Sequence, residues 1–130
     1  MLVEEYFREI EGWITDCPYV VESCIEKYKR SFHVGIIEGR IKFTDGSLLH
    51  FLEFVSVKDE VNKFKYSYQF QTEDRQLIFR YDVAPHHKDI SSFPHHKHLG
   101  PGEVIAAAAP NLKEVLQEIE TILAGTLESC

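Results

Sequence analysis

The sequence has none of the features that mark a secreted or membrane-spanning protein. Its amino terminus carries acidic residues instead of a basic segment, and no long apolar segment follows, so no signal peptide is expected. No run approaches the ~20 apolar residues that a bilayer-spanning helix requires. The chain holds three cysteines and no Cys-x-x-Cys pair. The cysteines are therefore expected to be free thiols in a reducing cytoplasm, with no disulfide framework and no thiolate zinc site. The lack of a long apolar segment leads us to expect no membrane association.

Positive charge is scarce everywhere except in one segment. The formal net charge of −7 argues against a protein dedicated to binding nucleic acid. Residues 61–100 differ, because they hold six Lys or Arg against four Asp or Glu, whereas residues 1–60 hold seven against twelve. Five of the seven histidines also lie in residues 61–100. The positive charge of this segment grows as the pH falls through the ordinary histidine pKa of ~6.5.

Apolar residues recur with helical spacing at both ends of the chain. Within residues 2–15 they form a stripe opposite a set of acidic side chains, and Pro18 follows the last turn. This pattern predicts an amphipathic helix. A second helix is expected after Pro110 and Asn111, because its apolar residues also fall on one face. We expect both helices to cover the same face of a sheet.

Between the two helices the hydrophobic period changes from 3.6 to 2. Turn-forming residues at 44–47, 59–62 and 72–75 divide residues 19–83 into four or five strands, and the Asp45-Gly46 pair is a strong hairpin signal. The prolines and glycines of residues 83–102 predict a long loop, with a short strand after it. The expected fold is α+β: an N-terminal helix, a four- to five-stranded antiparallel meander sheet, a histidine-rich loop and a C-terminal helix, all in one domain of residues 1–130.

The strongest functional signal is the segment from Arg80 to His98. It contains two His-His pairs, each directly after a proline, and a closing His-x-His. Proline fixes its own φ angle, so each pair is held on a stiff support. The candidate functional residues are Arg80, Asp82, His86, His87, His95, His96, Lys97 and His98.

One interpretation of this segment is acid–base cleavage of RNA. Such a reaction needs a base for the 2′-hydroxyl proton, an acid for the leaving oxygen and a fixed cation near the phosphate. Histidine suits both proton-transfer roles because its pKa lies near working pH. Arg80 or Lys97 is the candidate cation, and Asp82 the candidate for orienting a histidine or holding Arg80. On this interpretation the segment needs no cofactor.

A metal site and a purely structural role are the other two interpretations. In an extended backbone His96 and His98 point to one side, and His86 or His87 with Asp82 would complete the ligands of a transition metal such as zinc. Histidines on a long loop also hydrogen-bond the backbone and each other, which would leave a non-catalytic interaction module.

Residues 63–70 form a strand whose two faces differ in character. Tyr66 and Tyr68 alternate with polar residues and are expected to face the core. Lys63, Lys65 and Gln69 fall on the opposite face of a regular strand. That face is either an extension of a phosphate-binding strip or an ordinary solvated surface.

The run QLIFRYDVAPHHKDISSFPHHKHLG resembles the signature of the TumE-like toxin family, a small domain family formerly of unknown function. The segments EEYFREIEGWI, GRIKFTDGSLLHFLEFV and KYSYQFQ also resemble members of that family, so the likeness covers nearly the whole chain. It implies a cytoplasmic toxin of a type II toxin–antitoxin module with an antitoxin partner. Cleavage of an RNA substrate follows by analogy with other small α+β toxins, and the sequence leaves a homodimer open. The motif carries over as candidate functional residues Arg80, Asp82, His86, His87, His95, His96 and His98.

Overall fold

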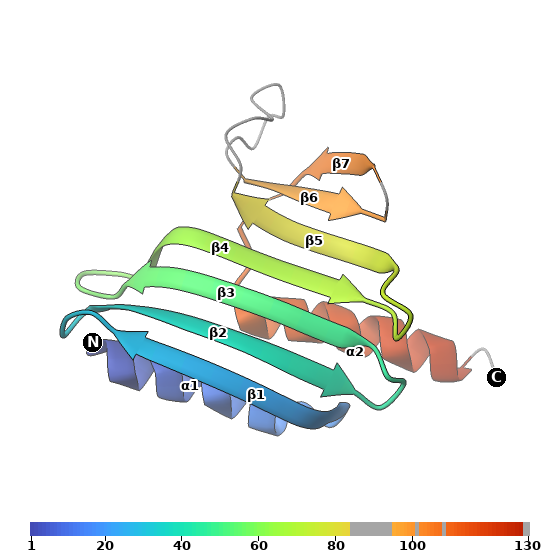
Figure 1. The fold of residues 1–130 in the computed structure, drawn as a ribbon, viewed down its shortest axis with the longest axis horizontal. Coiled ribbons are helices and arrows are strands. Elements are labelled where there is room, and N and C mark those ends of the chain that lie inside the picture. The colour runs from blue at the N-terminus through green and yellow to red at the C-terminus, as the bar shows by residue number, and fades with distance from the viewer. Residues whose placement is uncertain (84–94, 101, 108, 129–130) are drawn as a thin grey trace.

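The computed structural model describes residues 1–83, 95–100, 102–107 and 109–128. Along the chain, one helix precedes the strands and a second helix follows them (Figure 1). The elements are α1 (Val3–Asp16), β1 (Val20–Lys29), β2 (Val34–Phe43), β3 (Leu48–Ser56), β4 (Asn62–Gln71), β5 (Leu77–Val83), β6 (His95–Leu99), β7 (Glu103–Ala106) and α2 (Leu112–Glu128).

The strands form one antiparallel sheet in the order β1-β2-β3-β4-β5-β6-β7. This arrangement confirms the predicted α+β meander with a helix at each end, and the short strand expected after the histidines is β7. The sheet is larger than predicted, because His95–Leu99 is a strand and not part of a loop. β6 lies between β5 and β7, and its backbone pairs with both neighbours. That pairing, and not hydrophobic alternation, makes these residues extended.

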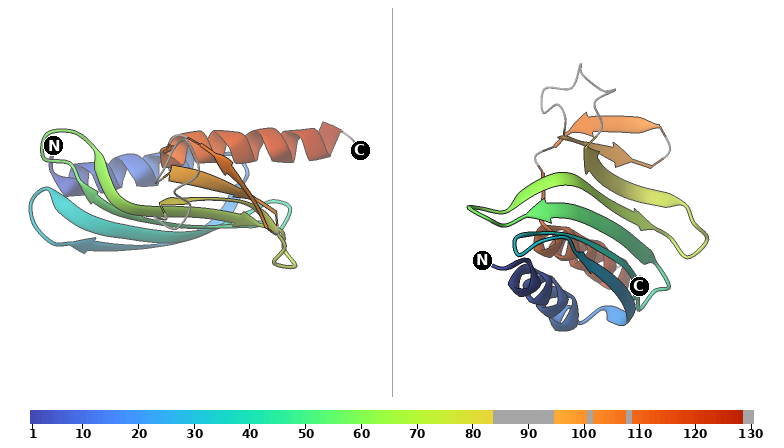
Figure 2. Two further views of the ribbon diagram at one scale, coloured as in Figure 1. Left: turned by 90° about the horizontal axis from the view of Figure 1, so that it is seen from above. Right: turned by 60° about the vertical axis from the view of Figure 1, so that its left-hand side comes forward.

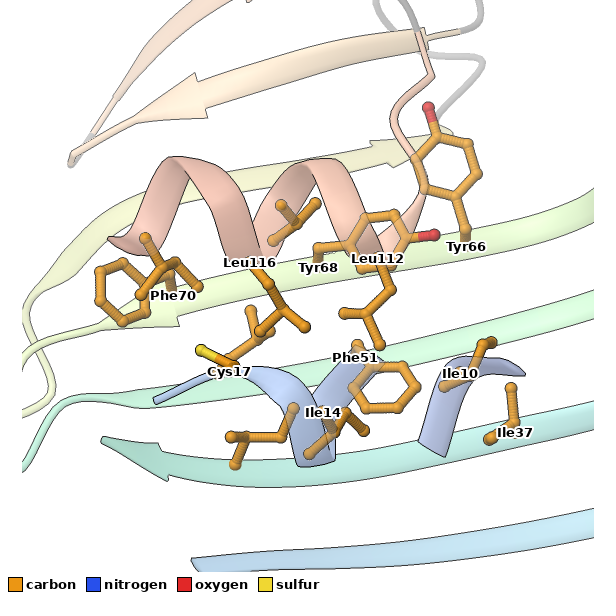
Figure 3. Packing of buried hydrophobic residues seen from close by; sticks show 14 of the residues in the cluster. Ile10, Ile14, Cys17, Ile37, Phe51, Tyr66, Tyr68, Phe70, Leu112 and Leu116 are labelled. Atoms are coloured by element: carbon orange, nitrogen blue, oxygen red, sulfur yellow. The ribbon is translucent and has the colours of Figure 1, made fainter. Parts of the chain in front are cut away.

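Both helices cover the same face of the sheet, as the sequence predicted (Figure 2). The fully buried core lies between the sheet and the helices. Figure 3 shows apolar side chains of α1 and α2 packed against side chains of the sheet. Strands β2 to β5 all contribute buried residues to this core, among them Ile37, Phe51 and Phe70, which Figure 3 labels. Of the elements that the structure describes, none covers the opposite face of the sheet, which we call the open face.

Local hydrogen bonds fix where α2 begins. Asn111 Oδ1 accepts from the backbone N–H of Glu114 at 2.8 Å, and Glu114 Oε1 accepts from the N–H of Asn111 at 3.0 Å. This reciprocal pair is a capping box, which satisfies N–H groups that the first helical turn leaves without partners.

Within the described residues, no helix combines the length and apolar character needed to cross a membrane.

A polar group is buried in the middle of this core. Glu53 on β3 has no exposed surface, and its carboxylate accepts hydrogen bonds from the hydroxyl of Tyr6 on α1 and, at 2.5 Å, from that of Tyr68 on β4. Burial, together with the Glu53 charge, raises the pKa of both tyrosines, so the hydroxyls keep their protons. The buried charge is therefore held by two donors that arrive from different elements.

The prediction that Lys63 shares the face of Lys65 and Gln69 is wrong. The register of β3 with β4 shifts between Phe54 and Val55, which pair with Lys65 and Lys63 respectively. A bulge of this kind turns a side chain to the other face of the sheet. Lys63 Nζ consequently donates to the hydroxyl of Tyr68 at 2.9 Å, on the helix-covered side, and burial lowers its pKa.

Candidate functional site

The alternation of β5 and β6 sorts the candidate residues onto two faces of the sheet. Asp82 pairs with His96, and Arg80 pairs with His98, so these four side chains share the open face. We call them the Asp82 cluster. His95 and Lys97 occupy the alternate positions of β6, facing the helices. His86 and His87 lie outside the residues that the structure describes.

Asp82 is the centre of the cluster. Its Oδ2 accepts from Arg80 Nε at 2.8 Å, and its Oδ1 lies 2.7 Å from His96 Nε2 and 3.5 Å from His98 Nε2. One carboxylate therefore contacts a guanidinium and two imidazoles. The proposal from sequence that Asp82 holds Arg80 or orients a histidine agrees with both sets of contacts.

Exposure falls across the cluster from Arg80 to His96. The Arg80 side chain is 36% exposed, that of His98 22% and that of Asp82 14%, whereas that of His96 is 1% exposed. Among the described members, Arg80 and His98 therefore present the most surface to a ligand. Asp82 and His96 lie beneath them, where they are suited to holding the exposed pair in position.

The environment of His98 favours its neutral form. Burial lowers the pKa of the His98 imidazole; the charge of Asp82 opposes this effect, and the nearby His96 and Arg80 reinforce it. A neutral imidazole has a lone pair on one ring nitrogen, so it accepts a proton or binds a metal ion. His98 thus has the protonation state that both chemical interpretations of the segment require.

Three ligand-type atoms of the cluster also converge. Asp82 contributes a carboxylate oxygen, and His96 and His98 each contribute a ring nitrogen, with all three atoms within 4.8 Å of one another. Two imidazoles and a carboxylate form a donor set that suits zinc and other first-row transition metals. Of the predicted ligands, the described residues thus bring together Asp82, His96 and His98, whereas His86 lies outside them.

Lys97 is held away from the cluster by contacts with α2. Its Nζ lies 2.7 Å from Glu118 Oε2, and the hydroxyl of Tyr81 donates to Glu118 Oε1 at 2.6 Å. Burial acts to lower the pKa of Lys97, but the hydrogen bonds and the electrostatic attraction of Glu118 and Tyr81 together outweigh it, so the net shift is upward. Lys97 is a cation that joins β6 to α2, on the face opposite Arg80.

His95 makes a second connection on the helix-covered side. Its Nδ1 is 2.9 Å from the hydroxyl of Tyr66, and the two rings stack with their centroids 5.8 Å apart. Tyr66 is buried, as expected from the alternation of β4, so it offers no stacking surface to a nucleic-acid base. His95 and Lys97 together attach the strand that carries His96 and His98.

Sequence reasoning identified Asp82 as a partner of Arg80, but it did not identify a second partner of Arg80 or any partner of Lys97. Gln69 Oε1 accepts from Arg80 Nη1 at 2.6 Å, and Glu118 binds Lys97. Gln69 became identifiable as a partner only through the register that pairs it with Arg80. Glu118 lies on α2 among apolar residues, and nothing in its spacing indicates that it reaches β6.

The fold and the cluster define a small α+β protein that carries a histidine–aspartate–arginine site on the open face of a meander sheet. A family model described as Toxin TumE matches residues 10–123. The chain therefore belongs to the TumE toxin family, which confirms the resemblance seen in its sequence. Comparisons with curated proteins and with solved structures gave no match.

Proposed function

We propose that this chain is the toxin of a type II toxin–antitoxin module and that it acts as a ribonuclease. Membership of the TumE toxin family supports a toxic activity and a protein antitoxin as partner. The observation that carries the ribonuclease proposal is the Asp82 cluster, in which one carboxylate contacts both a guanidinium and two imidazoles. That arrangement supplies a phosphate-binding cation beside a proton-transfer group.

The cluster suggests a division of roles among its members. Arg80 binds the scissile phosphate and offsets the charge that develops on it, while the neutral His98 accepts the proton of the attacking 2′-hydroxyl. Asp82 and His96 are positioning residues. The second proton-transfer group comes from His86 or His87, which stay candidates on sequence grounds alone.

Growth and cleavage assays test this proposal, with a matched pair of cation variants. Induced expression of the chain is expected to arrest bacterial growth, and the purified protein is expected to cleave single-stranded RNA in the presence of EDTA. Arg80→Ala should reduce cleavage by about 100-fold, because the developing charge loses its fixed cation. Lys97→Ala should reduce it far less, because Lys97 lies on the other face of the sheet. Normal growth together with intact RNA would overturn the proposal.

The convergence of three ligand atoms favours one second candidate function, the binding of a transition metal such as zinc. Asp82, His96 and His98 would be the ligands, and His86 stays a proposed fourth. Neutral imidazole is the form of histidine that binds a metal, and the lowered pKa of His98 favours it. In this candidate the cluster binds a metal without catalysing a reaction.

Elemental analysis of untagged protein decides this second candidate. Protein produced with ample zinc is expected to retain about one equivalent per chain after desalting if Asp82, His96 and His98 form a metal site. The double variant His96→Ala/His98→Ala should then retain none, while His33→Ala, which removes a histidine far from the cluster, should match the unaltered protein. Protein without stoichiometric metal under these conditions removes the candidate.

A further inference from the structure

The open face carries a second polar feature beside the Asp82 cluster. A pocket of about 390 Å³ lies over β2, β3 and β4, within the size range of sites for small ligands. Two leucines contribute to its lining, and no carboxylate does. Its polar lining residues are Arg40, His50, Gln69, Gln71 and Arg75.

The cationic side chains of the pocket differ in whether a carboxylate pairs with them, although Glu26 and Glu38 lie near Arg40 in a neighbouring hollow. His50 Nε2 lies 2.8 Å from Glu38 Oε1, so that imidazole already has an acidic partner. Arg40 and Arg75 are exposed, and neither forms an ion pair with a carboxylate in the part of the chain that the structure describes. Two guanidinium groups beside a pocket without carboxylates form a site complementary to anionic groups, phosphate above all.

The sheet register connects this pocket to the cluster. Arg40, His50, Gln69, Arg80 and His98 are successive cross-strand neighbours from β2 to β6, so they form one row across the open face. Neighbouring strands are ~4.8 Å apart, so the row extends over ~19 Å. That length accommodates a few nucleotides of a single strand.

Side-chain hydrogen bonds also connect the pocket to the Asp82 cluster. Gln69 Nε2 donates to Gln71 Oε1 at 3.2 Å inside the pocket, and Gln69 Oε1 accepts from Arg80 Nη1 at 2.6 Å. Arg80 in turn donates to Asp82 at 2.8 Å. The side chains that line the pocket are therefore directly linked to those that surround the proposed scissile phosphate.

We propose that this row, together with Arg75 from the turn between β4 and β5, binds the sugar–phosphate backbone of single-stranded RNA. Arg40 and Arg75 would hold phosphates on one side of the phosphate at Arg80. The inference rests on the proposed ribonuclease function, because it supplies that reaction with its substrate-binding surface. The sequence has a net charge of −7, but binding of backbone phosphates depends on the cations near them, and the row with Arg75 places Arg40, Arg75 and Arg80 near one another. Contacts to phosphate position a strand without selecting its sequence.

Binding is best measured with an RNA that the protein cannot cleave. A fluorescein-labelled 2′-O-methyl oligouridylate of about eight nucleotides lacks the nucleophilic hydroxyl, so anisotropy reports binding by the unaltered chain. Arg40→Ala/Arg75→Ala is expected to weaken binding by at least ~10-fold and to reduce the slope of log affinity against log salt by ~1.4. An oligodeoxythymidylate of equal length should compete, because the contacts are to phosphates.

A matched variant separates this effect from a simple change in net charge. Arg8→Ala/Lys113→Ala removes the same two charges from the helices, on the opposite side of the sheet, and is expected to bind like the unaltered protein. Equal losses in both double variants, no loss in Arg40→Ala/Arg75→Ala, or failure of the DNA to compete would each overturn the inference. If the protein binds RNA through the row but does not cleave ordinary RNA, only the proposed ribonuclease function is overturned.

Discussion

Replacing His98 with alanine is expected to reduce RNA cleavage by about 1,000-fold and to relieve growth arrest in cells that express the chain. The variant removes the one imidazole of the described cluster that combines partial exposure with a lowered pKa. Proton transfer by a positioned side chain contributes ~10²- to 10⁴-fold to rate. Initial rates of cleavage of a labelled single-stranded RNA measure the effect directly.

His33→Ala serves as the histidine control for this experiment. His33 Nδ1 contacts the backbone carbonyl of Met1 at 2.8 Å, at the start of the chain and away from the cluster. This variant should cleave RNA at the unaltered rate. Thermal denaturation of both variants verifies that they are folded. A folded His98→Ala protein with full cleavage activity would exclude His98 from the proposed reaction.

Replacing Glu53 with alanine is expected to lower the free energy of unfolding by about 3 kcal/mol, which corresponds to a fall in Tm on the order of 10 °C. The substitution removes the shared acceptor of two tyrosine hydroxyls, those of Tyr6 and Tyr68, in the middle of the core. The O–H group of each tyrosine would lose its acceptor, and a buried donor without an acceptor costs about 1–3 kcal/mol. Urea denaturation measures the change.

Two further variants define the origin of that loss. Glu53→Gln keeps the volume of the side chain and a carbonyl acceptor, so its stability should lie between those of Glu53→Ala and the unaltered protein. Glu60→Ala removes an acidic residue from the exposed turn before β4 and should change the free energy by less than about 0.5 kcal/mol. If Glu53→Ala is as stable as Glu60→Ala, the buried hydrogen bonds contribute nothing.

The helices and strands β2 to β5 were predictable because each has one apolar face, whereas in β1 only Val20 and Ile25 are partly buried and the other residues are exposed. The stripe of α1 and the alternation of β2 to β5 both follow from burial on a single side, and Gly46, with a φ of 85°, supplies the turn that the Asp-Gly pair predicted. β6 was not predictable in this way. Its sequence, His-His-Lys-His-Leu, is polar on both faces, so periodicity gives no strand signal, and its prolines and glycines nearby suggested a loop.

For the candidate site, the sequence predicted the residues and the shared side of His96 and His98, but not the pairing of β6 with β5 that places them beside Arg80 and Asp82. The sequence grouped eight candidate residues. The structure brings four of them together, Arg80, Asp82, His96 and His98, and places His95 and Lys97 on the other face, whereas His86 and His87 lie outside the described residues. The separation of Lys97 from those four follows only once residues 95–99 are known to be a strand. The role of Gln69 depends on the register between β4 and β5, which local sequence does not encode.

Because the two faces of β6 carry different side chains, the register of β6 with β5 determines which side chains lie beside Asp82. His96 and His98 are on the open face, whereas His95 binds Tyr66 and Lys97 binds Glu118 on the other side. Sliding β6 by one residue would exchange these sets, placing an ammonium group beside Asp82 and turning the imidazoles of His96 and His98 toward the helices. A displacement by two residues would preserve the parity. A shift by an odd number of residues therefore moves His96 and His98 to the helix-covered face, whereas a shift by an even number keeps them on the open face. A single-residue insertion in β6 would have the effect of an odd shift on the residues that follow it.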